Sequence, residues 1–141
     1  MVVPSEEITG PATITGFAFH RSPSGSRSVT ITGATVYIGM AGGDELGPEF
    51  LSNRVSQTRV IHSESLTVTA DDDGMVTFTF DTPWEYDEGD ILIELSFQSV
   101  SGYLYVFGWT SPGRRYLSSQ SLAAERGSVS HNLPVITLIT E

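Results

Sequence analysis

The chain has 141 residues, and its 17 acidic and seven basic side chains give it a net charge of −10. This length suits one domain, so we expect residues 1–141 to share a single core. The charge excludes surfaces for nucleic acid or anionic lipid, because both partners need cations. Cysteine is absent, which excludes disulfides and thiol chemistry. No apolar run approaches the roughly 20 residues of a membrane-spanning helix, so we expect no membrane insertion.

Alternation of apolar and polar residues predicts β-strands along the first third of the chain. The segment Thr13–His20 places Phe17 on one face and Ile14 on the other. The segment Val29–Met40 continues the pattern but is interrupted at Gly33, which indicates a bulge or a tight bend. Helical spacing is almost missing from these segments, so we expect an all-β domain.

A β-hairpin is predicted in the middle of the chain. Val60–Ala70 ends in an alternating run with Leu66 and Val68 directed inward, and Met75–Phe80 returns with the same period. Between them, Asp71–Gly74 ends in Asp-Gly, a pair that favours the left-handed positions of a tight turn. These two segments therefore pair directly.

Three further strands are expected after the hairpin. Ile91–Phe97 alternates strictly, whereas Tyr103–Trp109 is apolar on both faces, as a central strand covered on both sides would be. Leu133–Thr140 forms the last strand, and Pro134 near its start favours an edge position because proline lacks an N–H donor. Before these strands, Thr82–Trp84 and Tyr86–Asp90 are rich in turn and aromatic residues and predict a connection after Phe80.

Two segments depart from the strand pattern. Gly43–Arg54 is expected to hold a short helical turn that buries Phe50 and Leu51, and Gly113–Ser130 a long loop with one short strand. About eight short strands separated by turns indicate an antiparallel two-sheet sandwich, similar to a jelly roll.

No catalytic pattern stands out, so we expect a protein without enzymatic activity. His20, His62 and His131 are far apart in the sequence and lack metal-binding spacing. No Gly-x-Ser-x-Gly motif is present. The carboxylates of Glu85 and Glu88 are crowded into one turn, unlike a glycosidase pair drawn from separate strands.

Two acidic clusters, Asp71–Asp73 and Asp87–Asp90, have two interpretations. Aspartate and glycine are good turn residues, which explains both clusters without a ligand. Alternatively, adjacent loop carboxylates and carbonyls supply the oxygens that Ca²⁺ prefers, with Asp87 and Asp90 as the ligands in the second cluster. Calcium is the only cofactor that the sequence suggests.

Aromatic side chains form the candidate ligand surface. Flat rings stack on pyranose rings, so a polysaccharide is one candidate partner; the other interpretation is a core and rim filled by large side chains. The candidate ligand-binding residues are Trp84, Tyr86, Tyr105 and Trp109, with Tyr103 and Tyr116 as further members. The single basic pair, Arg114-Arg115, would either hold a carboxylate of a partner or form an internal ion pair.

Both ends of the chain are apolar and suit edge strands. An edge strand can add to the open sheet of a neighbouring subunit, and such contacts propagate into filaments unless a ring closes. Alternatively, each end pairs within its own domain. The candidate assembly residues are Val2, Val3, Ile8, Val135, Ile136 and Leu138. Under this hypothesis, removal of either terminal segment abolishes assembly and leaves the domain folded.

Motifs in order along the chain resemble a sandwich domain of secreted bacterial surface proteins, which often carry sorting tails of the PEP-CTERM or Bacteroidetes type. The motifs are Gly16-Phe17, Glu49-Phe50-Leu51-Ser52-Asn53, Thr82-Pro83-Trp84-Glu85-Tyr86 and Asp90-Ile91-Leu92-Ile93-Glu94-Leu95, with Arg114–Ser118 and Leu133-Pro134 later. In that family the corresponding motifs are Thr-Pro-Phe-x-Tyr and Asn-Leu-Leu-Leu-Glu-Ile. Here Trp84 stands in place of the Phe and Asp90 in place of the Asn. The resemblance implies an extracellular, non-catalytic module.

The sequence therefore predicts an extracellular or surface-exposed structural or adhesive module, with a virion surface as a further location. Its partners would be copies of itself or a larger surface protein. The alternative is a carbohydrate-binding module that uses the aromatic residues, assisted by calcium. The N-terminus lacks the basic start and apolar core of a signal peptide, so the chain is either intracellular or viral, or a mature or excised domain.

Overall fold

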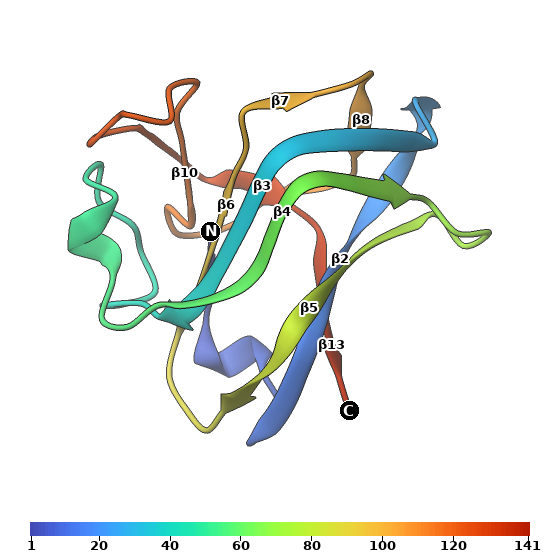
Figure 1. The fold of residues 1–141 in the computed structure, drawn as a ribbon. Coiled ribbons are helices and arrows are strands. Elements are labelled where there is room, and N and C mark those ends of the chain that lie inside the picture. The colour runs from blue at the N-terminus through green and yellow to red at the C-terminus, as the bar shows by residue number, and fades with distance from the viewer.

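A computed structural model describes all 141 residues, Met1–Glu141. Thirteen strands and two short 3-10 helices follow one another along the chain (Figure 1). In order they are β1 (Val2–Val3), η1 (Ser5–Glu7), β2 (Ala12–Gly25), β3 (Ser28–Met40), η2 (Leu51–Asn53), β4 (Thr58–Thr69), β5 (Met75–Tyr86), β6 (Ile91–Ser96), β7 (Ser99–Val100), β8 (Leu104–Val106), β9 (Gly108–Thr110), β10 (Tyr116–Ser118), β11 (Ser128–Ser130), β12 (Asn132–Pro134) and β13 (Ile136–Thr140).

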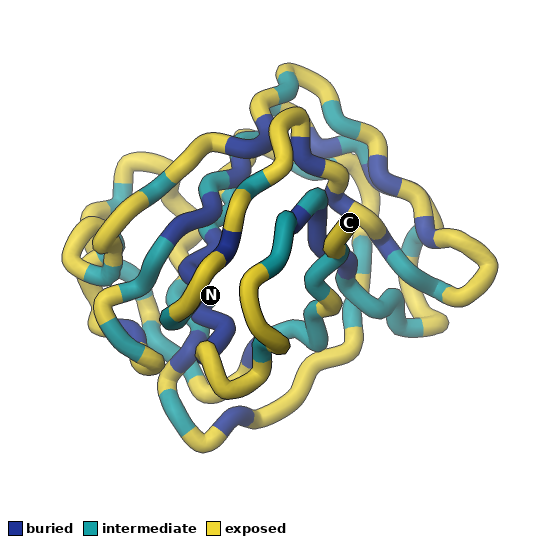
Figure 2. Tube along the Cα trace, turned by 90° about the horizontal axis from the view of Figure 1, so that it is seen from below, coloured by how far each residue is buried: buried dark blue, intermediate teal, exposed yellow.

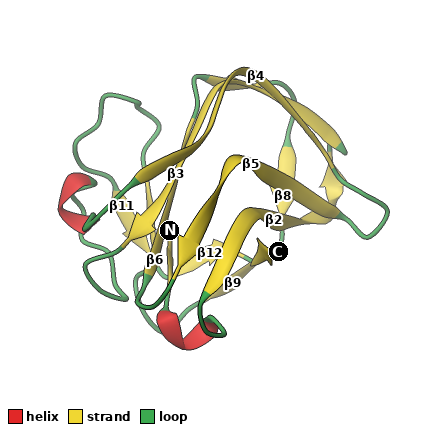
Figure 3. Cartoon of the chain, turned by 60° about the horizontal axis from the view of Figure 1, so that its bottom comes forward, coloured by secondary structure: helices red, strands yellow, loops and turns green.

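Two antiparallel sheets enclose the core. One has the order β1-β6-β3-β4, with β7 also paired to β3, and the other has the order β13-β2-β5, with β8 also paired to β2. The layer of β3 and β4 arches over the layer of β2 and β5 (Figure 3). Buried positions gather in the interior of the trace, and the outer loops are mostly exposed (Figure 2). The largest fully buried side chains are Phe17, Ile14, Ile38, Ile91, Val2, Val36, Val60 and Val76.

This architecture confirms the prediction of an all-β antiparallel sandwich. The structure has more than the eight strands expected, because two small ladders, β10-β11 and β12-β9, lie outside the main sheets. They are formed by the segment Gly113–Ser130, where one short strand was expected, and by its neighbours. No helix of the structure has the length and apolar character needed to cross a membrane.

A bulge in β2 changes which side chains enter the core. Two steps along β2, from Ile14 to Gly16, lie opposite one step along β13, from Thr140 to Ile139, so β2 has one extra residue at this point. Simple alternation predicted Ile14 and Phe17 on opposite faces, but the extra residue at the bulge brings both into the same core cluster. The prediction for Ile14 is therefore wrong.

The turn predicted between β4 and β5 is present, but the prediction that the two strands pair directly is wrong. β4 pairs with β3 and β5 pairs with β2, in different sheets, and only an isolated bridge, Ala70↔Val76, joins the two segments next to the turn. Val68 is buried and Leu66 is half-buried, while Thr67 and Thr69, which alternate with them, are exposed. In the turn, Asp71 Oδ1 accepts hydrogen bonds from the N–H groups of Asp73 and Met75, both at 2.9 Å, and Gly74 has φ of 80°. The aspartate and the glycine thus fix the turn.

Two expectations about connecting segments are corrected. β5 does not end before Thr82 but runs on through Pro83 and Trp84 to Tyr86, because it is an edge strand in which a proline is tolerated. In the Gly43–Arg54 segment a helical turn is present as η2, yet Leu51 is 69% exposed and Phe50 only half-buried. Leu46 is the buried side chain of that loop instead.

The prediction of a central strand over Tyr103–Trp109 is wrong. The segment forms two short strands, and at Phe107 it leaves the end of β2 and joins β12. Phe107 N donates to His20 O at 2.8 Å, and Phe107 O accepts from Val135 N at 2.8 Å. No third layer covers the outer face of this segment, so its aromatic side chains are exposed.

The last predicted strand is present as β12 and β13. Pro134 ends β12, and β13 lies at the edge of its sheet, so the predicted edge position is confirmed. β13 pairs with β2 through five residue pairs from Ile136↔Phe19 to Thr140↔Ile14.

Candidate functional site

A row of exposed aromatic side chains occupies every second residue from Tyr103 to Trp109. Tyr103 is 73% exposed, Tyr105 and Phe107 are each 52% exposed, and Trp109 is 38% exposed. Between them, Leu104 and Val106 are half-buried, and Leu104 packs against the core. The strand alternation thus turns the aliphatic residues inward and leaves the aromatic row in solvent.

The end of β2 supports the first half of the aromatic row. Gly25 pairs with Leu104, and the rings of Tyr103 and Tyr105 lie parallel to within 9° with centroids 6.4 Å apart. The Tyr105 ring lies directly over Gly25, where an added Cβ would come within 2.5 Å of Tyr105 Cδ2. Gly25 also has φ of 81°, so glycine is required here for two reasons. The exposed Ser24 of β2 adds a hydroxyl group to this end.

Arg115 supports the other end of the row. Its guanidinium lies 5.9 Å from the centroid of the Trp109 ring, within the range of a cation–π contact. The side chain is only 5% exposed and donates from Nη1 to Glu7 Oε1 at 2.7 Å, with Glu6 at 3.7 Å. Arg115 O accepts from Val2 N at 2.9 Å. Arg115 therefore ties the aromatic row to the N-terminal segment and forms the internal ion pair that was one of its two predicted roles.

We expect Glu7→Gln to lower the free energy of unfolding by about 1–2 kcal/mol, because it leaves the buried Arg115 charge with only the distant Glu6 carboxylate. The half-exposed position of Glu7 keeps the effect below that of a fully buried pair. The matched control is Glu49→Gln, which breaks an exposed ion pair with Arg126 and should change stability by less than about 0.5 kcal/mol. Urea unfolding followed by circular dichroism measures both, and equal effects would contradict the assigned role of Arg115.

The other two predicted ligand residues lie elsewhere. Trp84 and Tyr86 pair with Ile14 and Ala12 at the opposite end of β2 from Tyr105. Tyr86 is buried, and its hydroxyl donates to Gly89 O at 2.9 Å. Burial raises the pKa of Tyr86, and the nearby acidic groups, Asp90 first, raise it further. The four predicted residues thus form two separate groups, of which only Tyr105 and Trp109 belong to the aromatic row.

The acidic loops make contacts within the chain. Asp90 Oδ1 accepts from Ser5 N at 2.8 Å and so holds the start of η1. Asp72 forms an exposed ion pair with Arg27 at 3.0 Å. No group of three or more acidic, histidine or cysteine side chains is close enough to hold a metal ion. Asp87 and Asp90, the predicted calcium ligands, therefore lack a third carboxylate.

Both terminal segments pair within the domain. Val2 and Val3 pair with Leu92 and Ile91 of β6 and are 1% and 7% exposed. Because this segment is buried, we expect its removal to open the core and destabilise the domain. Val135 bonds to Phe107, and Ile136 and Leu138 belong to β13.

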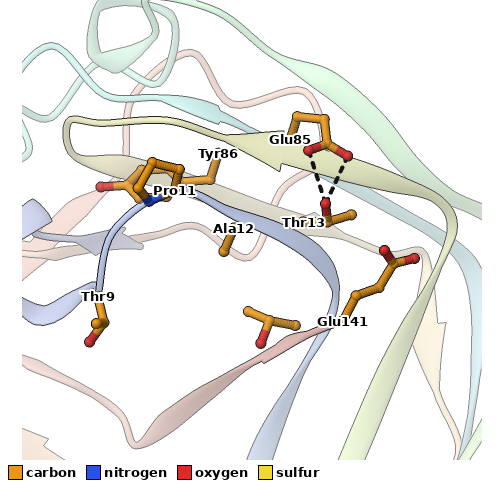
Figure 4. A pocket seen from close by; sticks show the side chains of 8 residues that line it. Thr9, Pro11, Ala12, Thr13, Glu85, Tyr86 and Glu141 are labelled. Carbon is orange, nitrogen blue, oxygen red and sulfur yellow. Dashed lines mark hydrogen bonds between the residues drawn. The ribbon is translucent and has the colours of Figure 1, made fainter.

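The structure brings four of the six predicted assembly residues, Val3, Ile8, Ile136 and Leu138, to one place. A groove of about 340 Å³ runs between β13 and the N-terminal segment. We call it the β13 groove, and it is lined by Val3, Glu7, Ile8, Thr9, Ala12, Ile14, Ile136, Leu138 and Thr140. A polar hollow of about 520 Å³ continues from it and shares Thr9, Ala12 and Thr140 (Figure 4).

Sequence reasoning missed several residues of these surfaces. Phe107 belongs to the aromatic row, and the period of two in Tyr-x-Tyr-x-Phe-x-Trp was the signal that could have found it. Glu7, Glu85 and Glu141 come together only through the fold, since they lie at distant positions in the chain. No local sequence pattern identifies these three residues as neighbours.

No protein-family model, curated protein or solved structure matches this chain. The resemblance to domains of bacterial surface proteins therefore stays a prediction.

Proposed function

We propose that this chain is a non-catalytic, surface-exposed adhesive module that binds an uncharged polysaccharide on its aromatic row. The observation that carries the proposal is the exposure of four aromatic side chains along one short segment, Tyr103–Trp109. Exposed apolar patches of this kind mark interaction surfaces on soluble domains. Pyranose rings present C–H faces that pack on aromatic faces, as apolar ligands do.

Charge restricts the kind of glycan. The chain carries a net charge of −10. Of the two arginines beside the aromatic row, Arg115 is buried and neutralised by Glu7, and the guanidinium of Arg21 is held by the backbone carbonyls of Gly25 and Ser26. A polyanionic glycan would therefore be repelled over most of the surface. An uncharged polysaccharide is not repelled by the protein's net charge. Hydroxyl groups such as that of Ser24 can form hydrogen bonds with its hydroxyl groups.

We expect the double variant Tyr103→Ala/Tyr105→Ala to weaken binding to a neutral polysaccharide at least about tenfold, because each aromatic contact is worth about 0.5–1.5 kcal/mol. Pull-down on cellulose and chitin, and affinity electrophoresis with neutral and anionic soluble glycans, measure the loss. Gly25→Ala should weaken binding without removing a ring, since it displaces Tyr105.

The matched control is Val55→Ala, which shortens an exposed apolar side chain outside the aromatic row. Trp84→Ala should also leave binding unchanged in the fraction that folds, because Trp84 lies at the opposite end of β2. A Tyr103/Tyr105 variant that binds every glycan as the parent does would show that the row is not the sugar surface.

Assembly through an edge strand is a second candidate function, favoured by β13. This strand pairs with β2 on one side only, and the β13 groove lies beside it. Unpaired edge strands are templates for strand addition. In this role the module would attach to copies of itself or to a larger surface protein while the aromatic row stays free.

A further inference from the structure

The outer edge of β13 is open in this fold. Hydrogen bonds of Ile136–Thr140 lead to β2, and none joins this strand to a third element. Natural proteins usually cover, shorten or charge such an edge. The other edge near this region, β1, is covered, because Val2 N donates to Arg115 O. Of these two neighbouring edges, β13 is therefore the one that stays available for a further strand.

The β13 groove supplies pockets for the side chains of an added strand. Its walls include the half-buried Ile8, Ile136 and Leu138, and its floor includes the buried Val3 and Ile14. A strand paired to β13 would direct every second side chain toward these residues. Apolar side chains at alternate positions would then replace water over the aliphatic walls, as in other cases of strand addition.

The charges around the groove select the partner. Glu7 lines the groove, and Glu85 and Glu141 line the hollow that continues from it, where both carboxylates are exposed (Figure 4). No arginine or histidine lines either depression. The nearest cation, Arg115, is buried against Glu7. The surroundings of an added strand are therefore apolar in the middle and negative at the ends.

A second copy of this chain matches these surroundings poorly. It would bring another charge of −10 and another set of the same carboxylates to the contact. The chain has no lysine. Its one run of adjacent basic residues is Arg114-Arg115, which is fixed in the fold because Arg115 is paired with Glu7 and the strand that follows, β10, is paired with β11. An exposed basic strand is thus absent from this molecule.

We propose that the β13 groove binds an extended segment of a different protein, in which apolar residues alternate with other residues and lysine or arginine stands at the ends. This inference rests on the second candidate function, assembly through β13, and names its partner by chemistry. Main-chain hydrogen bonds to β13 would hold the segment, the apolar side chains would fill the groove, and the cations would face Glu7, Glu85 and Glu141.

The test uses the full chain and three blocked, fluorescent peptides of equal length, in which valine alternates with threonine and the residues at both ends are lysine, threonine or glutamate. Fluorescence anisotropy at low and physiological salt measures binding, and hydrogen exchange maps it. We expect the lysine peptide to bind at least about tenfold more tightly than the threonine peptide and the glutamate peptide to fail. Salt should weaken the lysine complex, and the amides of Ile136–Thr140 should become protected.

Charge variants separate this site from general attraction to an acidic protein. Glu85→Gln/Glu141→Gln removes two carboxylates at the hollow and should weaken the lysine peptide at least about fivefold. Glu125→Gln, in a distant exposed loop, is the matched control and should have little effect. Both are conservative surface changes, so both proteins should fold.

Each other outcome overturns a defined part of the proposal. Equal binding of the lysine and threonine peptides would remove the charge requirement, and protection away from β13 would remove the site. Oligomers that protect β13 in light scattering and exchange would identify a second copy as the occupant, so assembly would survive and the partner proposed here would not. Failure of every peptide together with a strict monomer would overturn both.

Discussion

Replacing Gly39 with alanine is expected to lower the free energy of unfolding by about 3 kcal/mol or more. Gly39 is buried in β3, and an added Cβ would fall 1.9 Å from Ser56 O and 2.9 Å from Gln57 Cα. Both are backbone atoms, and Ser56 O already accepts from Met40 N at 3.1 Å. Relief of the clash therefore requires separation of two paired segments, which exceeds the usual cost of overpacking a core side chain.

Gly43→Ala is the matched control for this variant. No atom lies within 4 Å of an added Cβ at Gly43, and its backbone is not left-handed. We expect the free energy of unfolding to change by less than about 1 kcal/mol. Any gain would arise because alanine lowers the conformational entropy of the unfolded chain. Urea unfolding followed by circular dichroism compares the two, and a Gly39→Ala protein as stable as the control would contradict the close approach described here.

The second large effect is a loss of stability as the pH falls from about 8 to 5. The amino group of Met1 is buried and donates to Ile93 O at 2.9 Å. Burial lowers its pKa from 8.0 to about 5, and the charge of Glu94 opposes this shift only in part. Between these two pH values the unfolded chain holds a proton that the folded chain has released. The free energy of unfolding therefore rises with pH in this window.

Because one pKa unit corresponds to about 1.4 kcal/mol, this group alone should make the fold about 3–4 kcal/mol more stable at pH 8.5 than at pH 5. Urea unfolding across this range measures the slope, with mass spectrometry to confirm a free amino group at Met1. The control is the N-terminally acetylated chain, which keeps an N–H donor but cannot be charged, so its slope should be smaller by this amount. Parallel slopes for the two proteins would contradict the prediction.

Local patterns predicted the elements that depend on neighbouring residues. The turn at Asp71–Gly74 was found because its residues lie within one short stretch, whereas the separation of β4 and β5 into two sheets depends on their distant partners β3 and β2. Tyr103–Trp109 was misplaced because hydrophobicity does not tell whether another layer exists to cover a strand. The bulge at Ile14 was also missed, since nothing in Thr13–His20 marks an extra residue.

The candidate surfaces depended still more on distant parts of the chain. The aromatic residues of the row were visible in the sequence, but their exposure follows from the change of partner at Phe107. The β13 groove needs Ile8 and Leu138, which lie at opposite ends of the chain, to meet across the two sheets. The sequence suggested that both ends form strands, whereas their partners within the domain became visible only in the folded chain.

The unequal anchoring of the two ends has a mechanical consequence. β1 is held to β6 by two residue pairs, whereas β13 is held to β2 by five, and β2 is also bound to β5 and β8. Under tension between the two ends, β1 would detach first, the Arg115–Glu7 contact behind it would break next, and the sheet of β2 would then bear the load. An adhesive module built this way would lengthen by one short segment under shear flow while its aromatic row kept its support on β2.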